Sequence, residues 1–167
     1  SVTVSRDQIM KLIIALLLTF ATTIFADSLP EAFYGHFTVD HSENFDEYLE
    51  AKGYGFFTRK LIAFSKFDKV FTKAGGGTFN YDNLTTKKDV HYKNIVLGKP
   101  FVGEGLDSTK HRVTFSLRGG KLYEHHVPLD ANAEAKEEEY VYTPMGNQLV
   151  MTMEANGVVG KRYYKHA

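Results

Sequence analysis

The segment near the C-terminus contains the residues whose types and spacing most clearly indicate chemistry. From Val158 to Lys165 the sequence alternates in a way that predicts a β-strand with successive side chains on opposite faces. Lys161 and Lys165 share one face, which is expected to lie in solvent, so Arg162 and Tyr164 point inward. A buried guanidinium without an anion costs several kcal/mol of folding free energy. The pattern therefore predicts an anionic partner for Arg162.

The partner of this arginine can be of two kinds. No acidic residue falls on the inward face of this strand or of the preceding one, 148–155, where Met151 and Met153 face inward. One interpretation is an internal ion pair with an acid elsewhere in the chain. The other is an apolar ligand with one carboxylate, held by Arg162 and by the hydroxyl group of Tyr164. The methionines would then form a pliable apolar wall, although core packing alone also explains them.

The composition is that of one ordinary globular domain. Of the 167 residues, 43% are hydrophobic and 24% are charged, and 20 Lys and Arg balance 20 Asp and Glu. These values exclude disordered, collagen-like and coiled-coil chains, and the balanced charge argues against nucleic acid as a partner. Because the sequence contains no cysteine, it has no disulfide, no thiol nucleophile and no thiolate metal site.

Other groups of residues give no sign of catalysis, of a metal or of a cofactor. The sequence contains no nucleophile elbow, no glycine-rich phosphate loop and no zinc motif. The adjacent His125 and His126 would point to opposite faces of a strand, so they cannot share one metal ion, and both are expected at the surface. We therefore expect a protein that is not an enzyme and that needs neither metal nor cofactor.

Residues 1–26 are expected to lie outside the folded domain. From Met10 the sequence has one lysine, an apolar run of 14 residues over 12–25 and then Ala26, which together predict a secretory signal peptide cleaved after Ala26. The run is shorter than the about 20 residues that a membrane helix needs. Met10 is the expected initiator, so residues 1–9 would be upstream sequence. We expect a secreted protein with a single domain over 27–167.

The remaining chain predicts an all-β domain with one pair of helices. The capping pair Asn44 and Glu47 predicts a helix over 44–53, and a second helix follows over 56–65. Turn residues separate ten alternating runs, which predict antiparallel strands over 35–40, 67–74, 78–85, 90–97, 101–105, 111–117, 121–128, 137–143, 148–155 and 158–165. So many hairpins in one small domain must pack as a sandwich or close as a barrel.

Several stretches of the sequence resemble the intracellular-type fatty-acid-binding proteins. The stretches are Phe33-Tyr-Gly-His-Phe-Thr-Val39, Asn44-Phe-Asp-Glu-Tyr-Leu49, Gly53-Tyr-Gly-Phe-Phe-Thr-Arg59, Gly119-Gly-Lys-Leu122 and Arg162-Tyr-Tyr164. The resemblance covers nearly all of 30–167 and implies a ten-stranded antiparallel up-and-down β-barrel with a helix-turn-helix lid between the first two strands. It also implies a buried fatty acid whose carboxylate meets Arg162 and Tyr164. With its signal peptide and its longer sequence around 97–107, the chain is most similar to the secreted nematode branch.

The resemblance assigns roles to further residues. The positions that match the lid and the portal are Phe45, Tyr48, Ile62 and Tyr92, and those that match the cavity wall are Met151 and Met153. Tyr142 stands where many members place a second inward arginine, so carboxylate binding is expected to be weaker or arranged differently. The helix residues Phe57 and Leu61 are also expected to face the cavity.

Together these observations predict a secreted monomer that carries a long-chain fatty acid or a similar apolar carboxylate. Two alternatives stay open: a carrier of a retinoid or another bulky lipid, and, in a different class, an isomerase that uses a buried Tyr or His. We also expect transient contact of the lid with a membrane when the ligand is delivered, and no binding of nucleic acid.

Overall fold

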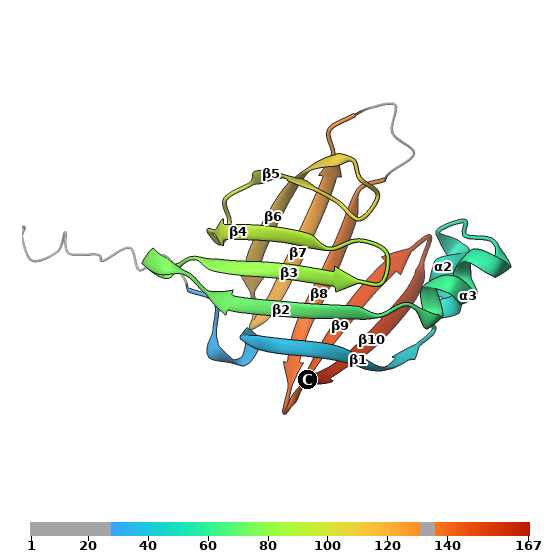
Figure 1. Ribbon diagram of the computed structural model, residues 1–167, viewed down its shortest axis with the longest axis horizontal. Helices are drawn as coiled ribbons and strands as arrows, with labels where there is room; N and C mark the ends of the chain where they lie inside the picture. Colours follow the sequence, from blue (N-terminus) through green and yellow to red (C-terminus); the bar gives the residue numbers. More distant parts are fainter. Residues whose placement is uncertain (1–27, 131–135) are drawn as a thin grey trace, which may run out of the picture.

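Ten antiparallel strands build the protein, whose computed structural model describes residues 28–130 and 136–167. The strands are β1 (Gly35–Glu43), β2 (Phe67–Lys73), β3 (Phe79–Thr85), β4 (Val90–Ile95), β5 (Phe101–Glu104), β6 (Lys110–Arg118), β7 (Lys121–Pro128), β8 (Glu138–Met145), β9 (Gln148–Ala155) and β10 (Val158–His166). They form one sheet in the order β4-β3-β2-β1-β10-β9-β8-β7-β6-β5, which curls into a nearly closed barrel (Figure 1). The ten-stranded antiparallel barrel expected from the sequence is therefore confirmed.

Tight turns set the register of the C-terminal strands. Between β9 and β10, Asn156 and Gly157 have φ angles of 49° and 81°. Between β6 and β7, Gly119 and Gly120 have φ angles of 56° and 74°. Glycine and asparagine adopt such angles most readily, and two-residue turns of this kind match the twist of the strands that they join. The hairpins predicted at these two turns are confirmed.

Aromatic side chains fill much of the barrel interior. The fully buried ones include Phe37, Phe71, Phe79, Tyr81, Phe115, Tyr142 and Tyr164. Their rings contact one another across strands: the ring centres of Phe71 and Tyr81 are 4.9 Å apart, and Phe79 meets Phe115 edge-on at 5.5 Å. Edge-to-face contacts add to the free energy gained by burying the rings. This core explains how the domain holds together without disulfides.

Two short helices, α2 (Phe45–Ala51) and α3 (Phe56–Phe64), connect β1 to β2 and lie at one end of the barrel (Figure 1). α2 packs closely on β10 because Gly160 has no side chain: a Cβ atom there would lie 2.9 Å from the Cβ atom of Tyr48. Nε of Arg59 on α3 donates to Asp46 on α2 at 3.1 Å. α2 is therefore fixed on the barrel, and α3 is held mainly through α2.

The orientation of α3 corrects one expectation from the sequence. Phe57, Leu61 and Phe64 are 82%, 71% and 88% exposed, so their face of α3 points to solvent and not to the cavity. The physical reason is that α2 occupies the inner side of α3, while Ile62 on the other face of α3 packs against the core. α2 begins at the expected residue, but Asn44 has a φ angle of 49° and makes no side-chain capping hydrogen bond.

The opposite end of the barrel is closed by the residues before β1. A short 3-10 helix, η1 (Glu31–Phe33), places Phe33 against the core, and Leu29 lies in the same cluster. Phe33 and Leu29 are 1% and 2% exposed. Lys73 at the end of β2 pairs with Glu31 at 2.5 Å. A second 3-10 helix, η2 (Gly75–Gly77), forms the turn between β2 and β3.

The predicted signal peptide lies outside the described residues. Its expected initiator Met10, its apolar run 12–25 and its cleavage position after Ala26 therefore stay predictions. Within the part of the chain that the structure describes, no helix is long and apolar enough to span a membrane.

Candidate functional site

Three of the expected site residues lie side by side across neighbouring strands. In the antiparallel register Tyr142 of β8 is opposite Met151 of β9, and Met151 is opposite Arg162 of β10. All three are buried, as is Met153, which lies opposite Gly160. The inward orientation expected from the alternation is observed for each of these side chains, and it gives the interior one row with a hydroxyl, a thioether and a guanidinium.

Arg162 is buried beside two aromatic rings. The carbon Cζ of its guanidinium lies 4.3 Å from the ring centre of Phe45 and 4.6 Å from that of Phe67. Its Nε atom has no hydrogen-bond partner, and no carboxylate of the described residues pairs with it. Burial lowers the pKa of Arg162, and Tyr164 acts in the opposite direction. The two rings stabilise the cation, but they leave a buried N–H donor free for another group.

Tyr164 adds a second free donor on the same face of β10. Its side chain is fully buried, and its hydroxyl group has no hydrogen-bond partner among the described residues. Burial raises the pKa of Tyr164 to about 12, although Arg162 lowers it. The hydroxyl group is therefore neutral near physiological pH and keeps its proton. Two unsatisfied donors beside an apolar interior can bind one amphipathic anion.

Tyr142, by contrast, is already bonded to a buried acid. Its hydroxyl group donates to Oε2 of Glu124 at 2.5 Å and lies 3.0 Å from the hydroxyl group of Tyr81. Nε2 of His126 lies 2.8 Å from Oε1 of Glu124, and Nζ of Lys69 donates to the hydroxyl group of Tyr81 at 2.9 Å. These five side chains form one polar network through the interior, from β2 and β3 to β7 and β8.

The network holds two opposite charges away from solvent. Burial alone would raise the pKa of Glu124, but its hydrogen bonds with His126 and Tyr142 and the nearby charge of Lys69 hold it below its ordinary value. Burial lowers the pKa of Lys69 to about 8, although Glu124 raises it. Near neutral pH Glu124 is therefore an anion and Lys69 is a cation.

The sequence did not lead us to expect Lys69, Glu124 and His126 in the site, although the alternation along β7 indicates the direction of two of them. Leu122 is an apolar residue of β7 that must face inward, and alternation places Glu124 and His126 on the same face. The expectation that His126 lies at the surface is wrong: it is 9% exposed because it pairs with Glu124 inside the barrel. His125 points to the opposite face, as expected.

The expected lid residues lie on the inner side of the helices. Phe45 is half-buried and its ring stacks near that of Tyr48, with centres 6.1 Å apart. Tyr48 is buried between α2 and β10, and Ile62 packs against the same core. Because Phe45 also lies over the guanidinium of Arg162, the lid and the expected carboxylate site are in direct contact.

Tyr92 connects β4 and β5, the two strands that end the sheet, through its side chain. Its hydroxyl group donates to the carbonyl oxygen of Glu104 at 3.0 Å. Its ring lies over Gly103, where a Cβ atom would be 2.6 Å from Cε1 of Tyr92, and Phe101 meets it edge-on at 5.1 Å. A surface cavity of about 730 Å³ lies between the two strands, lined by residues 88–96 and 99–104.

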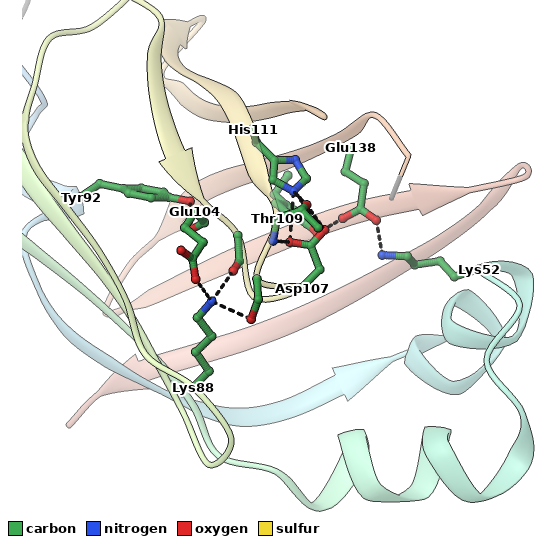
Figure 2. A network of polar contacts seen from close by, with 11 residues as sticks. Lys52, Lys88, Tyr92, Glu104, Asp107, Thr109, His111 and Glu138 are labelled. Atoms are coloured by element: carbon green, nitrogen blue, oxygen red, sulfur yellow. Dashed lines mark hydrogen bonds and ion pairs between the residues drawn. The ribbon is translucent and has the colours of Figure 1, made fainter. Parts of the chain in front are cut away.

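Charged side chains link the turns at the lid end of the barrel (Figure 2). Lys88, which precedes β4, contacts Glu104 and donates to Oγ of Ser108 at 3.0 Å. Lys52, just after α2, contacts Glu138 at the start of β8. These pairs are partly exposed, and exposed ion pairs contribute little free energy, so they can exchange partners readily. Among the described residues, no group of three or more His, Cys, Asp or Glu could hold a metal ion.

Comparison with known proteins decides the family. The chain is 59% identical over 153 residues to fatty acid-binding protein homolog 1 of Caenorhabditis elegans, which covers 91% of this chain and 96% of that protein. It is 31% identical over 138 residues to the intestinal fatty acid-binding protein of Homo sapiens, which covers 80% of this chain and 98% of that protein. The chain belongs to the fatty-acid-binding protein family. No protein-family model matches it.

A solved structure of a fatty-acid-binding protein agrees with this fold. As-p18, described as an extracellular fatty acid binding protein, superposes with a TM-score of 0.77 at 42% sequence identity. The match covers 84% of this chain and 99% of that one. The resemblance noted in the sequence is therefore confirmed at the level of family and fold, including the helix pair between β1 and β2.

Proposed function

We propose that this fatty-acid-binding protein is a carrier that encloses one long-chain fatty acid and holds its carboxylate at Arg162 and Tyr164. The observation that carries the proposal is the pair of unsatisfied buried donors on β10, Nε of Arg162 and the hydroxyl group of Tyr164. A carboxylate would satisfy both donors with charge-assisted hydrogen bonds. The names of the relatives support the same ligand class. The proposal includes no catalytic step.

The charge of the interior supports a ligand with one negative charge. The buried charged residues that point into the barrel are Lys69, Arg162 and Glu124, which together leave one positive charge among the described residues. Asp68 is also buried, but it pairs with Lys66 and His36 on the outer face of the sheet. One carboxylate would therefore neutralise the interior, and burial of the acyl chain against the aromatic lining would supply about 25 cal/mol per Å².

Matched ligands test the proposal. Stearic acid and stearyl alcohol share one chain, so the difference in their affinities reports the carboxylate contact. We expect the wild type to bind the acid about ten- to a hundredfold more tightly than the alcohol, because a hydrogen bond to a charged group contributes about 1.5–3 kcal/mol. Arg162→Gln should bind both ligands almost equally. Displacement of a fluorescent fatty acid measures all four affinities.

The control for this experiment is Met153→Leu, which changes the apolar wall and should change both affinities by the same factor. Equal affinity of the wild type and Arg162→Gln for stearic acid would place the carboxylate elsewhere. Tighter binding of retinol than of stearic acid would instead favour a carrier of bulky lipids.

We also propose that the protein is secreted and acts as a monomer. The signal-peptide pattern over 10–26 supports secretion, and As-p18, which is 42% identical, is described as extracellular. One barrel already contains every group that the proposed site needs, so a second copy is not required. Sedimentation equilibrium of the purified protein tests the monomer.

The solvent face of α3 supports contact with a membrane. Phe56, Phe57, Leu61 and Phe64 are exposed on it, and Nζ of Lys60 lies 5.3 Å from the ring centre of Phe56. Aromatic and aliphatic side chains with a nearby cation are typical of helices that lie in the interface of a lipid surface. We therefore propose that α3 touches the membrane while the ligand is transferred.

A further inference from the structure

An amide inside the barrel has an oxygen without a hydrogen-bond partner among the described residues. Asn83 of β3 is 8% exposed, and its Oδ1 atom makes no hydrogen bond with any described residue. It shares the inward face of β3 with Tyr81, whose hydroxyl group lies beside that of Tyr142. The great majority of buried polar atoms in folded proteins have a partner, because an unsatisfied one lowers stability. The orphaned atom of Asn83 therefore requires an explanation.

A cation with spare donors lies next to this amide. Lys69 of β2 is directly opposite Asn83 in the antiparallel register and is 5% exposed. Its ammonium group has three N–H donors, and the hydroxyl group of Tyr81 accepts one of them at 2.9 Å. Side chains opposite each other on one face of a sheet are close neighbours. The interior therefore offers an amide and unused N–H donors together, on strands other than the one that carries Arg162.

A hydroxyl group fits this pair better than other polar groups. The same oxygen can accept from the ammonium of Lys69 and donate to the amide oxygen of Asn83. If the amide is turned round, the hydroxyl oxygen can accept from its NH₂ group, so the fit does not depend on that assignment. A second carboxylate would not fit, because Lys69, Arg162 and Glu124 leave one positive charge, which the first carboxylate already balances.

We propose that Asn83 and Lys69 form a second polar subsite, which binds a hydroxyl group on the chain of the fatty acid. The protein then prefers hydroxylated fatty acids to unsubstituted ones. This inference rests on the proposed carrier function and narrows its ligand class: Arg162 and Tyr164 hold the carboxylate, and the second subsite holds the hydroxyl group.

The test compares stearic acid with a series of monohydroxystearic acids that differ only in the position of the hydroxyl group. Each acid displaces a fluorescent fatty acid from the purified protein near neutral pH. We expect at least one isomer to bind the wild type about tenfold more tightly than stearic acid, as a hydrogen bond to a charged group allows. Asn83→Leu should reduce this ratio to about one and leave the affinity for stearic acid almost unchanged.

Further variants separate the subsite from general effects on the barrel. Asn83→Thr replaces the amide by a hydroxyl group, which can also donate and accept, and threonine suits a strand, so this variant should retain part of the preference. Lys69→Met removes the other half of the subsite and should also lower the ratio, which keeps the test decisive if Asn83→Leu does not fold. Met153→Leu changes the wall without removing a polar group, so it should change the affinities for both acids by the same factor.

The outcomes distinguish the subsite from the carrier function. If stearic acid binds tightly and no isomer binds better, the subsite is overturned, and a water molecule is left as the partner of Asn83. A preference that survives both Asn83→Leu and Lys69→Met overturns it as well. If none of the acids binds to the wild type, the carrier function itself fails.

Discussion

Lys69 lies in the barrel interior with its ammonium group bonded to the hydroxyl group of Tyr81. Burial lowers the pKa of Lys69 to about 8 from an ordinary value of 10.5. Between these values the unfolded chain binds more protons than the folded protein, so the free energy of unfolding rises with pH. Burial raises the pKa values of Tyr81 and Tyr142 well above 10.0, so in the folded protein they stay protonated across this range.

We expect Lys69→Met to remove this pH dependence. From pH 8 to pH 10 the wild type should gain up to about 1.4 kcal/mol of unfolding free energy per pH unit from Lys69, and the variant should gain none of it. Below pH 8 Lys69 is charged in both the folded and the unfolded state, so it should add no further pH dependence to the wild type. Urea unfolding at a series of pH values measures both effects, with Lys161→Met on the solvent face as the control. Identical slopes in the wild type and Lys69→Met would contradict the lowered pKa.

The hydroxyl group of Tyr142 serves a buried acid, which changes what its removal should do. Tyr142→Phe takes one hydrogen bond from Glu124 and one neighbour from Tyr81. Because a buried acceptor then loses its donor, the free energy of unfolding should fall by about 1–3 kcal/mol. Affinity for stearic acid should fall less than in Arg162→Gln.

The control for Tyr142→Phe is Tyr123→Phe, which removes a hydroxyl group from the outer face of β7. Both variants are compared with the wild type by urea unfolding and by displacement of a fluorescent fatty acid. Unchanged stability together with a large loss of affinity would show that the hydroxyl group of Tyr142 serves the ligand directly.

At the scale of elements, the strands could be predicted because most of them alternate buried and more exposed residues, as β3 and β7 do. The two-residue period and the turns at Asn156-Gly157 and Gly119-Gly120 place the hairpins correctly. The orientation of α3 could not be predicted in the same way. Its apolar stripe, with Phe57 and Leu61, indicates a buried face only if a partner covers it, and the partner of α3 is α2 on the other side.

For the residues of the site too, the local pattern gives the direction of a side chain but not its partner. Alternation along one strand is enough to turn Arg162 and Tyr164 inward, and along β7 it also turns Glu124 inward. It does not reveal that Tyr81 of β3 meets Tyr142 of β8, because that contact crosses the interior between strands far apart in the sequence. The same contact links Lys69, which donates to Tyr81, with Glu124, which accepts from Tyr142. The closed sheet creates the polar network, and no single strand encodes it.

The exposed face of α3 gives a prediction about ligand transfer. Replacing Phe57, Leu61 and Phe64 together by serine should slow transfer of a fluorescent fatty acid to phospholipid vesicles at least about fivefold, because the apolar area that enters the lipid interface is gone. Affinity and stability should change little, since exposed side chains away from the core contribute little to folding. Stopped-flow fluorescence measures the transfer rate.

Two features keep this experiment specific to α3. A control variant replaces Val102 and Met145, which are exposed elsewhere on the barrel, and it should transfer the ligand as fast as the wild type. The wild-type rate should also rise with vesicle concentration, as contact with the membrane requires. A rate independent of vesicle concentration would indicate that the ligand leaves through water.

At the scale of the whole molecule, the two ends of the barrel are closed by different means. Beyond the start of β1, Leu29 and Phe33 pack into the core as apolar plugs. At the other end, α2 and partly exposed ion pairs such as Lys52 with Glu138 cover the strands. Apolar burial is hard to reverse, whereas exposed ion pairs exchange readily. We therefore expect a ligand to reach the interior from the lid end, past Phe45 and Arg162.

The packing of Leu29 and Phe33 into the core also limits where the predicted signal peptide can be cleaved without loss of stability. We expect export to remove residues up to Ala26, which leaves Leu29 and Phe33 in place, so a protein that starts at Asp27 should fold to full stability. A protein that starts at Tyr34 should lose several kcal/mol of unfolding free energy, because burial of each large apolar side chain contributes about 1.5–3 kcal/mol. N-terminal sequencing of the secreted protein and urea unfolding of both forms check these expectations. An intact 12–25 segment on the secreted protein, or a mature N-terminus after Leu29, would contradict them.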